Sequence, residues 1–360
     1  MFKKSLAAVA VLGAFAASSM AADVTVYGKV DMGLQYKNVE TTAFTGVETT
    51  KDALTLDSGV GQASRFGIKG TEDLGNGYKV TFKLENGFKA DSGDMSTTNK
   101  LFDREASLAV SSEWGTLMAG RFGSFSNAAS ATDIVMPRVD AYDGGHAGAE
   151  FVSFGKLNNA LAYLSPKVAG FQAAAIYSLD TDGKAGGREG HGDADRYAAV
   201  ALTYDVGALQ TAIGYEQLIR SNLPATKYAD QKIVTFGGNY DFDMFKLYVG
   251  GQYFEGADEV YDYTTTAKDG IEGYGLHVGT QFNALAGHFD AGVYFADMEA
   301  QEAKGRDGQY FGVAGRYVYD LSKRTNIRTT LAYNQSTWDG TTHDQEVETY
   351  VAKVSLTHNF

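Results

Sequence analysis

The chain has 360 residues, a formal net charge of −13 and no cysteine. The absence of cysteine excludes disulfides and thiolate chemistry, and the acidic balance argues against a nucleic-acid partner. Beyond residue 22, no run approaches the roughly 18 consecutive apolar residues that a transmembrane helix needs, so a membrane crossing would require a closed β-barrel.

The first 21 residues have the layout of a secretory signal peptide. A short basic start with two lysines precedes an apolar run over residues 6–17. Ser19-Met20-Ala21 fits the small-x-small cleavage pattern, and cleavage after Ala22 is also compatible with the sequence. We therefore expect residues 1–21 to be a cleaved signal peptide and residues 22–360 to form a single transmembrane domain. Loss of the two lysines changes the net charge from −13 to −15.

From Val24 onward, apolar and polar residues alternate with a period of two. In the first such segment, one face carries Val24, Val26, Val30, Met32, Leu34 and Tyr36, and the other carries Thr25, Lys29, Asp31, Gln35 and Lys37. The same alternation recurs around residues 78–85, 245–253, 310–320 and 326–334. Because successive side chains of a strand point to opposite faces, this pattern predicts antiparallel β-structure along the whole chain.

Short turns and long polar loops alternate between these segments. The short turns lie at 75–77, 113–115, 165–170, 205–207, 241–244, 283–287 and 320–324, and the long loops lie near 38–57, 90–100, 123–158, 180–195, 218–230, 256–270, 298–308 and 336–346. Seven turns and eight loops predict sixteen strands with both chain ends on the short-turn side. Outer-membrane barrels have even strand numbers, short periplasmic turns and long external loops. The predicted fold class is therefore all-β, a 16-stranded antiparallel transmembrane β-barrel.

A soluble all-β protein with one solvated face is the alternative. Against it, the faces that read inward are too polar to form a core, since they carry charged residues such as Lys83, Glu85 and Arg328. The opposite faces end repeatedly in Tyr or Phe, as the aromatic girdles of membrane barrels do. The last strand, residues 350–360, repeats this pattern and ends in Phe360. A barrel of sixteen strands is wide enough to leave an aqueous channel.

Five segments carry a resemblance to a known family. They are Val24-Thr-Val-Tyr-Gly-Lys-Val-Asp, Ser64-Arg-Phe-Gly-Ile-Lys-Gly, Glu72-Asp-Leu-Gly-Asn-Gly, Gly115-Thr-Leu-Met-Ala-Gly-Arg121 and Asn158-Asn-Ala-Leu-Ala-Tyr-Leu-Ser-Pro166. In this order and spacing, and over nearly the whole mature chain, they resemble the Gram-negative general diffusion porins, most closely the β-proteobacterial type.

The resemblance implies a homotrimer of outer-membrane barrels that pass small hydrophilic solutes and ions down their gradients. It also implies contacts with outer-membrane lipid and lipopolysaccharide. In that family the barrel-assembly machinery reads the C-terminal strand, which here ends in Phe360.

Porins of this kind fold their third long loop into the barrel and so narrow it. Here the segment near 123–158 is the longest connection, and a loop of this length is usually functional or disordered. Its charged candidates for the pore constriction are Asp133, Arg138, Asp140, Asp143 and Glu150. The loop lacks the Pro-Glu-Phe-Gly-Gly segment of enterobacterial porins, which leaves open which acid faces the pore. An external lid is the alternative.

The resemblance also implies a column of basic side chains on the opposite wall. The matching positions are Arg65, Arg104, Arg121 and Lys156. Strand parity places Arg104 and Arg121 on the same face as Leu108 and Leu117, unless a β-bulge intervenes. For each basic residue, the alternative is a structural salt bridge in the wall.

The balance of charge in the lumen predicts ion selectivity. Much of the acid lies in the predicted external loops, and by parity the inner wall carries more basic than acidic residues. The low-dielectric wall makes lumen charges count more than distant loop charges. We therefore expect a weak anion preference.

Other functions make different demands on the sequence. A substrate-specific channel for sugars or phosphate would need an aromatic track or a dense lysine funnel, and the inward Tyr248, Tyr294 and Tyr310 are scattered. The sequence has no dinucleotide or P-loop motif and no metal-spaced His/Cys cluster, so we expect no enzyme activity, no cofactor and no metal. An additional role of the loops as an adhesin or phage receptor is left open.

Overall fold

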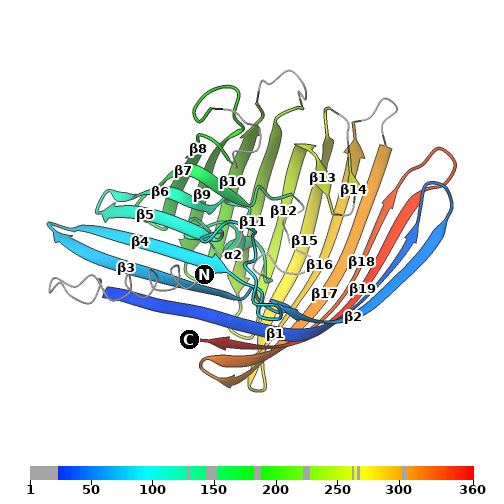
Figure 1. Ribbon diagram of the computed structural model, residues 1–360, viewed down its shortest axis with the longest axis horizontal. Helices are drawn as coiled ribbons and strands as arrows, with labels where there is room; N and C mark the ends of the chain where they lie inside the picture. Colours follow the sequence, from blue (N-terminus) through cyan, green and yellow to red (C-terminus); the bar gives the residue numbers. More distant parts are fainter. Residues whose placement is uncertain are drawn as a thin grey trace, which may run out of the picture.

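Seventeen strands form one antiparallel sheet that closes on itself in the computed structural model (Figure 1). The structure describes residues 23–127, 130–142, 152–181, 188–221, 228–261, 263–265, 268–301 and 306–360. The predicted signal peptide lies outside these ranges, so its cleavage stays a prediction. Within the described ranges, no helix is long and apolar enough to span a membrane.

The strands follow one another around the barrel in chain order. The first half comprises β1 Asp23–Thr42, β2 Glu48–Ser58, β3 Arg65–Gly75, β4 Tyr78–Gly87, β5 Glu105–Ser112, β6 Gly115–Gly123, β7 Lys156–Leu164, β8 Phe171–Ser178 and β9 Arg196–Val206. The second half comprises β10 Leu209–Ile219, β11 Gln231–Asp241, β12 Lys246–Ala257, β15 Ile271–Ala284, β16 Gly287–Ala300, β17 Arg306–Ser322, β18 Thr325–Trp338 and β19 Gln345–Asn359. A two-stranded hairpin, β13 Glu259–Val260 and β14 Tyr263–Thr264, and the helix α2 Met136–Val139 lie between barrel strands.

The seventeen strands occupy sixteen positions around the barrel, because β2 and β3 lie end to end in one of them. We call each position a stave. Both β2 and β3 pair with the long strand β1, β3 along residues 23–29 and β2 along residues 32–42. Pairing of β1 with β19 closes the barrel. At this seam, the amides of Gly28 and Phe360 each donate to the other's carbonyl (3.1 and 3.0 Å). The structure thus confirms the predicted 16-stranded antiparallel barrel.

One predicted loop is wrong in its extent. Most of the segment 38–57 is strand, because β1 continues to Thr42 and β2 begins at Glu48. Threonine and valine are frequent there, and both favour strands, while ladder hydrogen bonds do not require an apolar face. The polar side chains of this hairpin therefore belong to strands that extend beyond the lipid, not to a loop.

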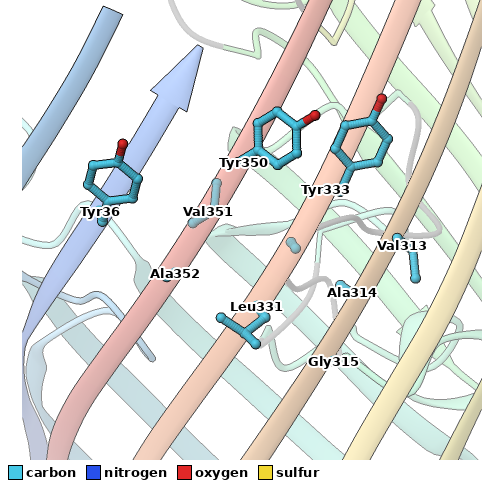
Figure 2. Close-up of a pocket in the computed structure, with 10 residues that line it drawn as sticks. Tyr36, Val313, Ala314, Gly315, Leu331, Tyr333, Tyr350, Val351 and Ala352 are labelled. Atoms are coloured by element: carbon cyan, nitrogen blue, oxygen red, sulfur yellow. The ribbon is translucent and has the colours of Figure 1, made fainter.

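The outer face of the wall is apolar. Its exposed residues are large and hydrophobic, for example Leu331 at 63% exposure. Figure 2 shows Tyr36, Tyr333 and Tyr350 side by side on β1, β18 and β19, with their hydroxyls directed the same way. Such a row of rings above aliphatic side chains is the aromatic girdle of a membrane barrel.

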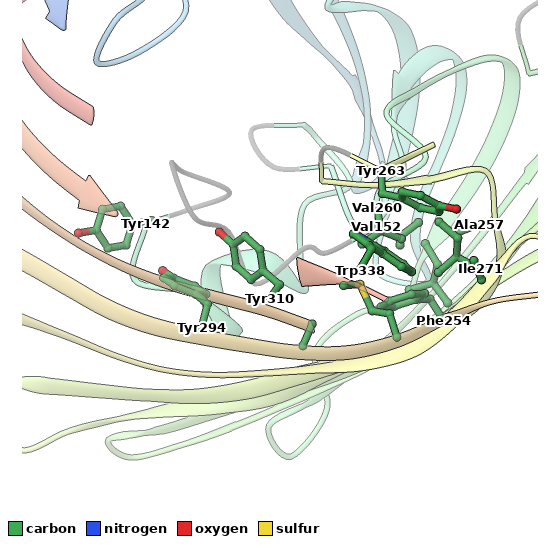
Figure 3. Packing of buried hydrophobic residues seen from close by; sticks show 14 of the residues in the cluster. Tyr142, Val152, Phe254, Ala257, Val260, Tyr263, Ile271, Tyr294, Tyr310 and Trp338 are labelled. Carbon is green, nitrogen blue, oxygen red and sulfur yellow. The ribbon is translucent and has the colours of Figure 1, made fainter. Parts of the chain in front are cut away.

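Part of the lumen is filled by packed side chains. The β13–β14 hairpin folds inward, where Tyr263 stacks on Trp338 with ring centroids 4.0 Å apart. Tyr261 stacks on Tyr310 in the same way, at 3.6 Å. Figure 3 shows this hydrophobic cluster along the inner wall, with Val152 close to Trp338. The open channel therefore lies toward the other side of the barrel.

Candidate pore constriction

Loop 3 spans residues 124–155, and its described parts, residues 124–127, 130–142 and 152–155, fold into the barrel as predicted. At its start, the Gly123 amide donates to Ser130 Oγ (2.7 Å) and Thr132 Oγ1 donates to the Gly123 carbonyl (2.7 Å), so the chain turns as soon as β6 ends. The loop carries α2, whose buried Met136 and Val139 lie on the side of β10, β11 and β12 (Figure 1). Loop 3 therefore lies against one inner side of the barrel.

Arg138 joins this loop to the wall. Its Nε and Nη2 donate to the two carboxylate oxygens of Asp205 on β9 (2.8 and 2.7 Å). The bidentate geometry is the strong form of an arginine–carboxylate pair. Asn239 Nδ2 on β11 also donates to the Arg138 carbonyl (2.9 Å). The structure places this predicted constriction residue in an anchoring ion pair.

Asp140 also faces the wall. Its Oδ1 accepts hydrogen bonds from the Tyr142 amide (3.1 Å) and from Tyr294 Oη (3.3 Å). Tyr142 Oη in turn donates to the carbonyl of Asp290 (3.1 Å), and burial raises the pKa of the Tyr142 phenol above its usual value. Asp140 is buried among these groups and is not presented to the lumen.

The remaining predicted acids of the loop have different positions. Asp133 is half-buried, and its amide donates to the Ser130 carbonyl (3.1 Å). Asp143 and Glu150 lie outside the described residues. Their part in the constriction stays a prediction.

Two polar side chains of the wall hold the two ends of the loop. Gln252 accepts from the Val152 amide (2.8 Å) and donates to the Val152 carbonyl (2.9 Å), pairing with the backbone as a neighbouring strand would. Ser126 Oγ donates to Glu216 Oε2 (3.2 Å), which also accepts from Tyr197 Oη (2.6 Å). Loop 3 is thus fixed at several points along its course.

The basic residues gather on the wall formed by β1, β3, β4 and β5 and the start of β7. Lys29 stands opposite Arg65 in the β1–β3 ladder and is also an electrostatic neighbour of Arg104. Arg104 in turn interacts with Lys156. The structure therefore brings Arg65, Arg104 and Lys156 into one group.

Acidic partners lie within this group. Arg104 Nε donates to Glu85 Oε1 (2.7 Å), and Lys83 Nζ donates to Glu105 Oε2 (2.8 Å). Tyr27 Oη donates to the other oxygen of Glu85 (2.8 Å). The sequence analysis missed Glu105, although alternation along β5 places it on the inner face with Ser107.

Arg121 is hydrogen-bonded to residues close in sequence to Arg104 and Lys156. Its Nε donates to the Asp103 carbonyl (2.8 Å) and its Nη1 to Asn158 Oδ1. The β6–β7 register shifts between Gly120 and Phe122, so the bulge that the sequence left open is present at Arg121. Asp103 is also an electrostatic neighbour of Arg121. The role of Arg121 in the constriction stays a prediction.

Burial separates the acids of the inner wall from its bases. Five of these acids are at most 3% exposed: Asp31 0%, Glu85 3%, Glu105 1%, Glu216 1% and Asp290 0%. The bases Lys29, Arg65, Arg104 and Lys156 are only half-buried. Among these nine residues, the charge that reaches water is therefore mainly positive.

Comparisons with known proteins agree with this architecture. A family model described as Gram-negative porin matches residues 7–339. An outer membrane porin protein of Bordetella pertussis is 30% identical, covering 90% of this chain and 92% of its own length. Outer membrane porin protein 32 of Delftia acidovorans is 27% identical, covering 92% and 89%. A solved structure, an anion-selective porin from Comamonas acidovorans, matches with a TM-score of 0.66 at 22% identity, covering 94% of this chain and all of that one.

Fold, site and relatives lead to one class of protein. A closed barrel with a lipid-facing outer wall, a polar inner wall and an inward loop is a diffusion channel of the outer membrane. The family model spans most of the chain, including every strand from β1 to β18. The chain belongs to the Gram-negative porin family.

Proposed function

We propose that this porin is a general diffusion channel with a weak anion preference, set by the basic wall across the lumen from loop 3. The observation that carries the proposal is the burial difference between inner-wall acids and bases. A charge exposed to the lumen acts on passing ions at short range, whereas a buried carboxylate is already balanced by its partners. Small anions should therefore enter the narrow region more readily than small cations.

The constriction in this proposal consists of Arg65, Arg104 and Lys156 on the wall and loop 3 on the other side. Arg138 and Asp140 act as anchors of the loop. The name of the Comamonas acidovorans relative, an anion-selective porin, supports the sign of the preference. The pairing of Arg104 with Glu85 and of Lys83 with Glu105 keeps the preference weak.

We further propose a homotrimer in contact with outer-membrane lipid and lipopolysaccharide, assembled through the C-terminal strand and Phe360. An OmpT structure of Vibrio cholerae with a TM-score of 0.59 at 15% identity is described as a trimer form, which supports the first part. The apolar outer wall and its tyrosine row support the lipid contact. We also propose that the chain has no enzyme activity.

A sugar-specific channel is less well supported. Sugars bind to exposed aromatic faces, but Tyr248, Tyr294 and Tyr310 are 6%, 0% and 4% exposed and pack in the hydrophobic cluster of the inner wall. No track of rings is offered to the lumen by these residues.

Liposome swelling tests the general diffusion channel. Purified protein should admit neutral sugars at rates that fall smoothly with solute size and do not saturate with concentration. Saturation by one sugar, or competition between sugars of equal size, would favour a substrate-specific channel. No swelling with folded protein would contradict the porin function itself.

A further inference from the structure

The second stave is interrupted between Ser58 and Arg65. Met32 pairs with Ser58 and Lys29 pairs with Arg65, so only two residues of β1 face the interruption. A regular strand would place two residues there, but this chain has six, residues 59–64, which we call the inner segment. Its four extra residues have no place in the ladder and must leave the plane of the sheet.

Asp31 holds the inner segment against the inner face. The amide of Gly61 donates to Asp31 Oδ1 (2.9 Å), and the amide of Gly59 donates to the Asp31 carbonyl (2.9 Å). Ser64 Oγ donates to the same carbonyl (3.1 Å) and accepts from the Asp31 amide (3.0 Å). Asp31 is fully buried and belongs to the inward face of β1. The extra residues are therefore folded toward the lumen.

The same carboxylate connects the inner segment to the last strand. Asp31 Oδ2 accepts from Ser355 Oγ (3.1 Å) and from Thr357 Oγ1. Gly61 is tightly enclosed, since a Cβ at this position would lie 2.4 Å from Ser355 Oγ and 2.8 Å from Arg328 Cδ. One carboxylate thus fixes a segment against two strands across the barrel seam.

We propose that the inner segment is a second, fixed jaw of the constriction, and that Asp31 is the positioning residue that locks it. This inference rests on the proposed porin function. The inner segment runs directly into Arg65 and lies beside Arg328, and both are electrostatic neighbours of Lys29. Among the sixteen staves, β1 is the first and β10, which contacts α2, is the ninth, so the inner segment and loop 3 lie on opposite sides of the lumen.

Deletion of residues 60–63 tests the jaw. The deletion leaves Gly59 and Ser64 opposite Asp31 and Val30, the two residues of β1 that face the interruption. Because an even number of residues is removed, every side chain of β2 and β3 stays on its face of the sheet. Because the deletion removes part of the lumen lining and widens the channel, single-channel conductance should rise roughly 1.5-fold over the parent chain. A folded variant with parental conductance would overturn the jaw.

If the deletion does not fold, Gly61→Ala replaces it, with Gly315→Ala as the matched control. The nearest atom to a Cβ at Gly315 is 3.7 Å away, so that substitution should leave conductance unchanged. The crowded Gly61→Ala variant should displace the inner segment and change the conductance. Equal conductance of the two alanine variants would overturn the jaw.

Asp31→Asn tests the positioning role, and Asp52→Asn is its control. Asp52 has the same strand parity as the exposed Leu54 and Leu56, so it lies on the outer face of β2, and Asp52→Asn changes the net charge equally. Asp31→Asn should raise single-channel conductance toward that of the deletion variant, because the neutral amide holds the Gly61 amide and the Ser355 hydroxyl more weakly and releases the inner segment. Equal conductance of the two variants would overturn the positioning role. If the parent chain itself carries no current, the porin function fails instead.

Discussion

Arg138 donates two hydrogen bonds to Asp205, and this pair joins loop 3 to β9 across 67 residues of sequence. Asp205 has a second cation, Lys167 Nζ at 2.6 Å, in the short turn after β7. The side chain of Arg138 is 15% exposed, whereas that of Lys167 is 49% exposed. The Asp205 carboxylate thus has a largely buried partner, Arg138, and an exposed partner, Lys167. Substitution of each in turn compares their contributions to stability.

Arg138→Gln should loosen loop 3. Loss of a largely buried charged pair lowers the free energy of unfolding by about 1–3 kcal/mol. The open-channel current should become noisier, because the loop is released at one anchor. The control Lys167→Gln removes an exposed partner, which costs less than about 1 kcal/mol, and should leave the noise unchanged. Identical noise in both variants would show that Arg138 does not anchor the loop.

Arg104→Gln should reduce the anion preference. The substitution removes a half-buried positive charge and also leaves Glu85 with less compensation, so both changes favour cations. Reversal potentials under a salt gradient would measure the shift. Arg324→Gln, in the periplasmic turn between β17 and β18, removes the same charge outside the lumen. A shift of equal size in both variants would mean that net charge, rather than the wall, decides selectivity.

Selectivity should also fall at high salt. The Debye length shortens from about 10 Å at 0.1 M to about 3 Å at 1 M ionic strength, so the field of the basic wall in the aqueous lumen is screened over a shorter distance. The chloride-to-potassium permeability ratio should therefore move toward one as the mean salt concentration rises. A ratio that does not change with salt would point to selection by size or by a binding site instead.

Gly28→Ala should weaken the barrel seam. A Cβ at Gly28 would lie 2.3 Å from Phe360 Cζ and 2.7 Å from the Arg65 carbonyl oxygen. Overpacking of this kind typically costs about 1–3 kcal/mol, so the variant should unfold at a lower temperature than the parent in a heat-modifiability gel. Gly315→Ala, where an added Cβ would make only an ordinary van der Waals contact, should unfold with the parent. Unchanged stability of Gly28→Ala would mean that Phe360 moves aside without cost.

Periodicity and turn spacing were enough to predict the barrel. A side chain in a strand has only two directions, so the alternation of Val24 with Thr25 already separates lipid from lumen. The sequence could not separate polar strand from loop near Thr42, since polarity there reflects height above the membrane. The inner segment was missed for a related reason, because Gly59 and Gly61 resemble an ordinary turn.

The candidate site was harder to predict than the fold. Arg65, Arg104 and Lys156 could be placed through the family resemblance, and the structure brings them together. Which acids reach water depends on tertiary contacts, such as those of Asp140 with Tyr294 on β16 and of Asp31 with Ser355 on β19. No local pattern contains such partners, because they come from more than 150 residues away.

The sign of the reversal potential in a potassium chloride gradient tests the account most directly. Purified protein in a planar bilayer of neutral lipid should give a potential displaced toward the chloride equilibrium value, but well short of it. That result would mean that the half-buried bases of the inner wall outweigh the buried acids. A potential displaced toward the potassium equilibrium value would contradict the account, because the acidic loops would then control the pore.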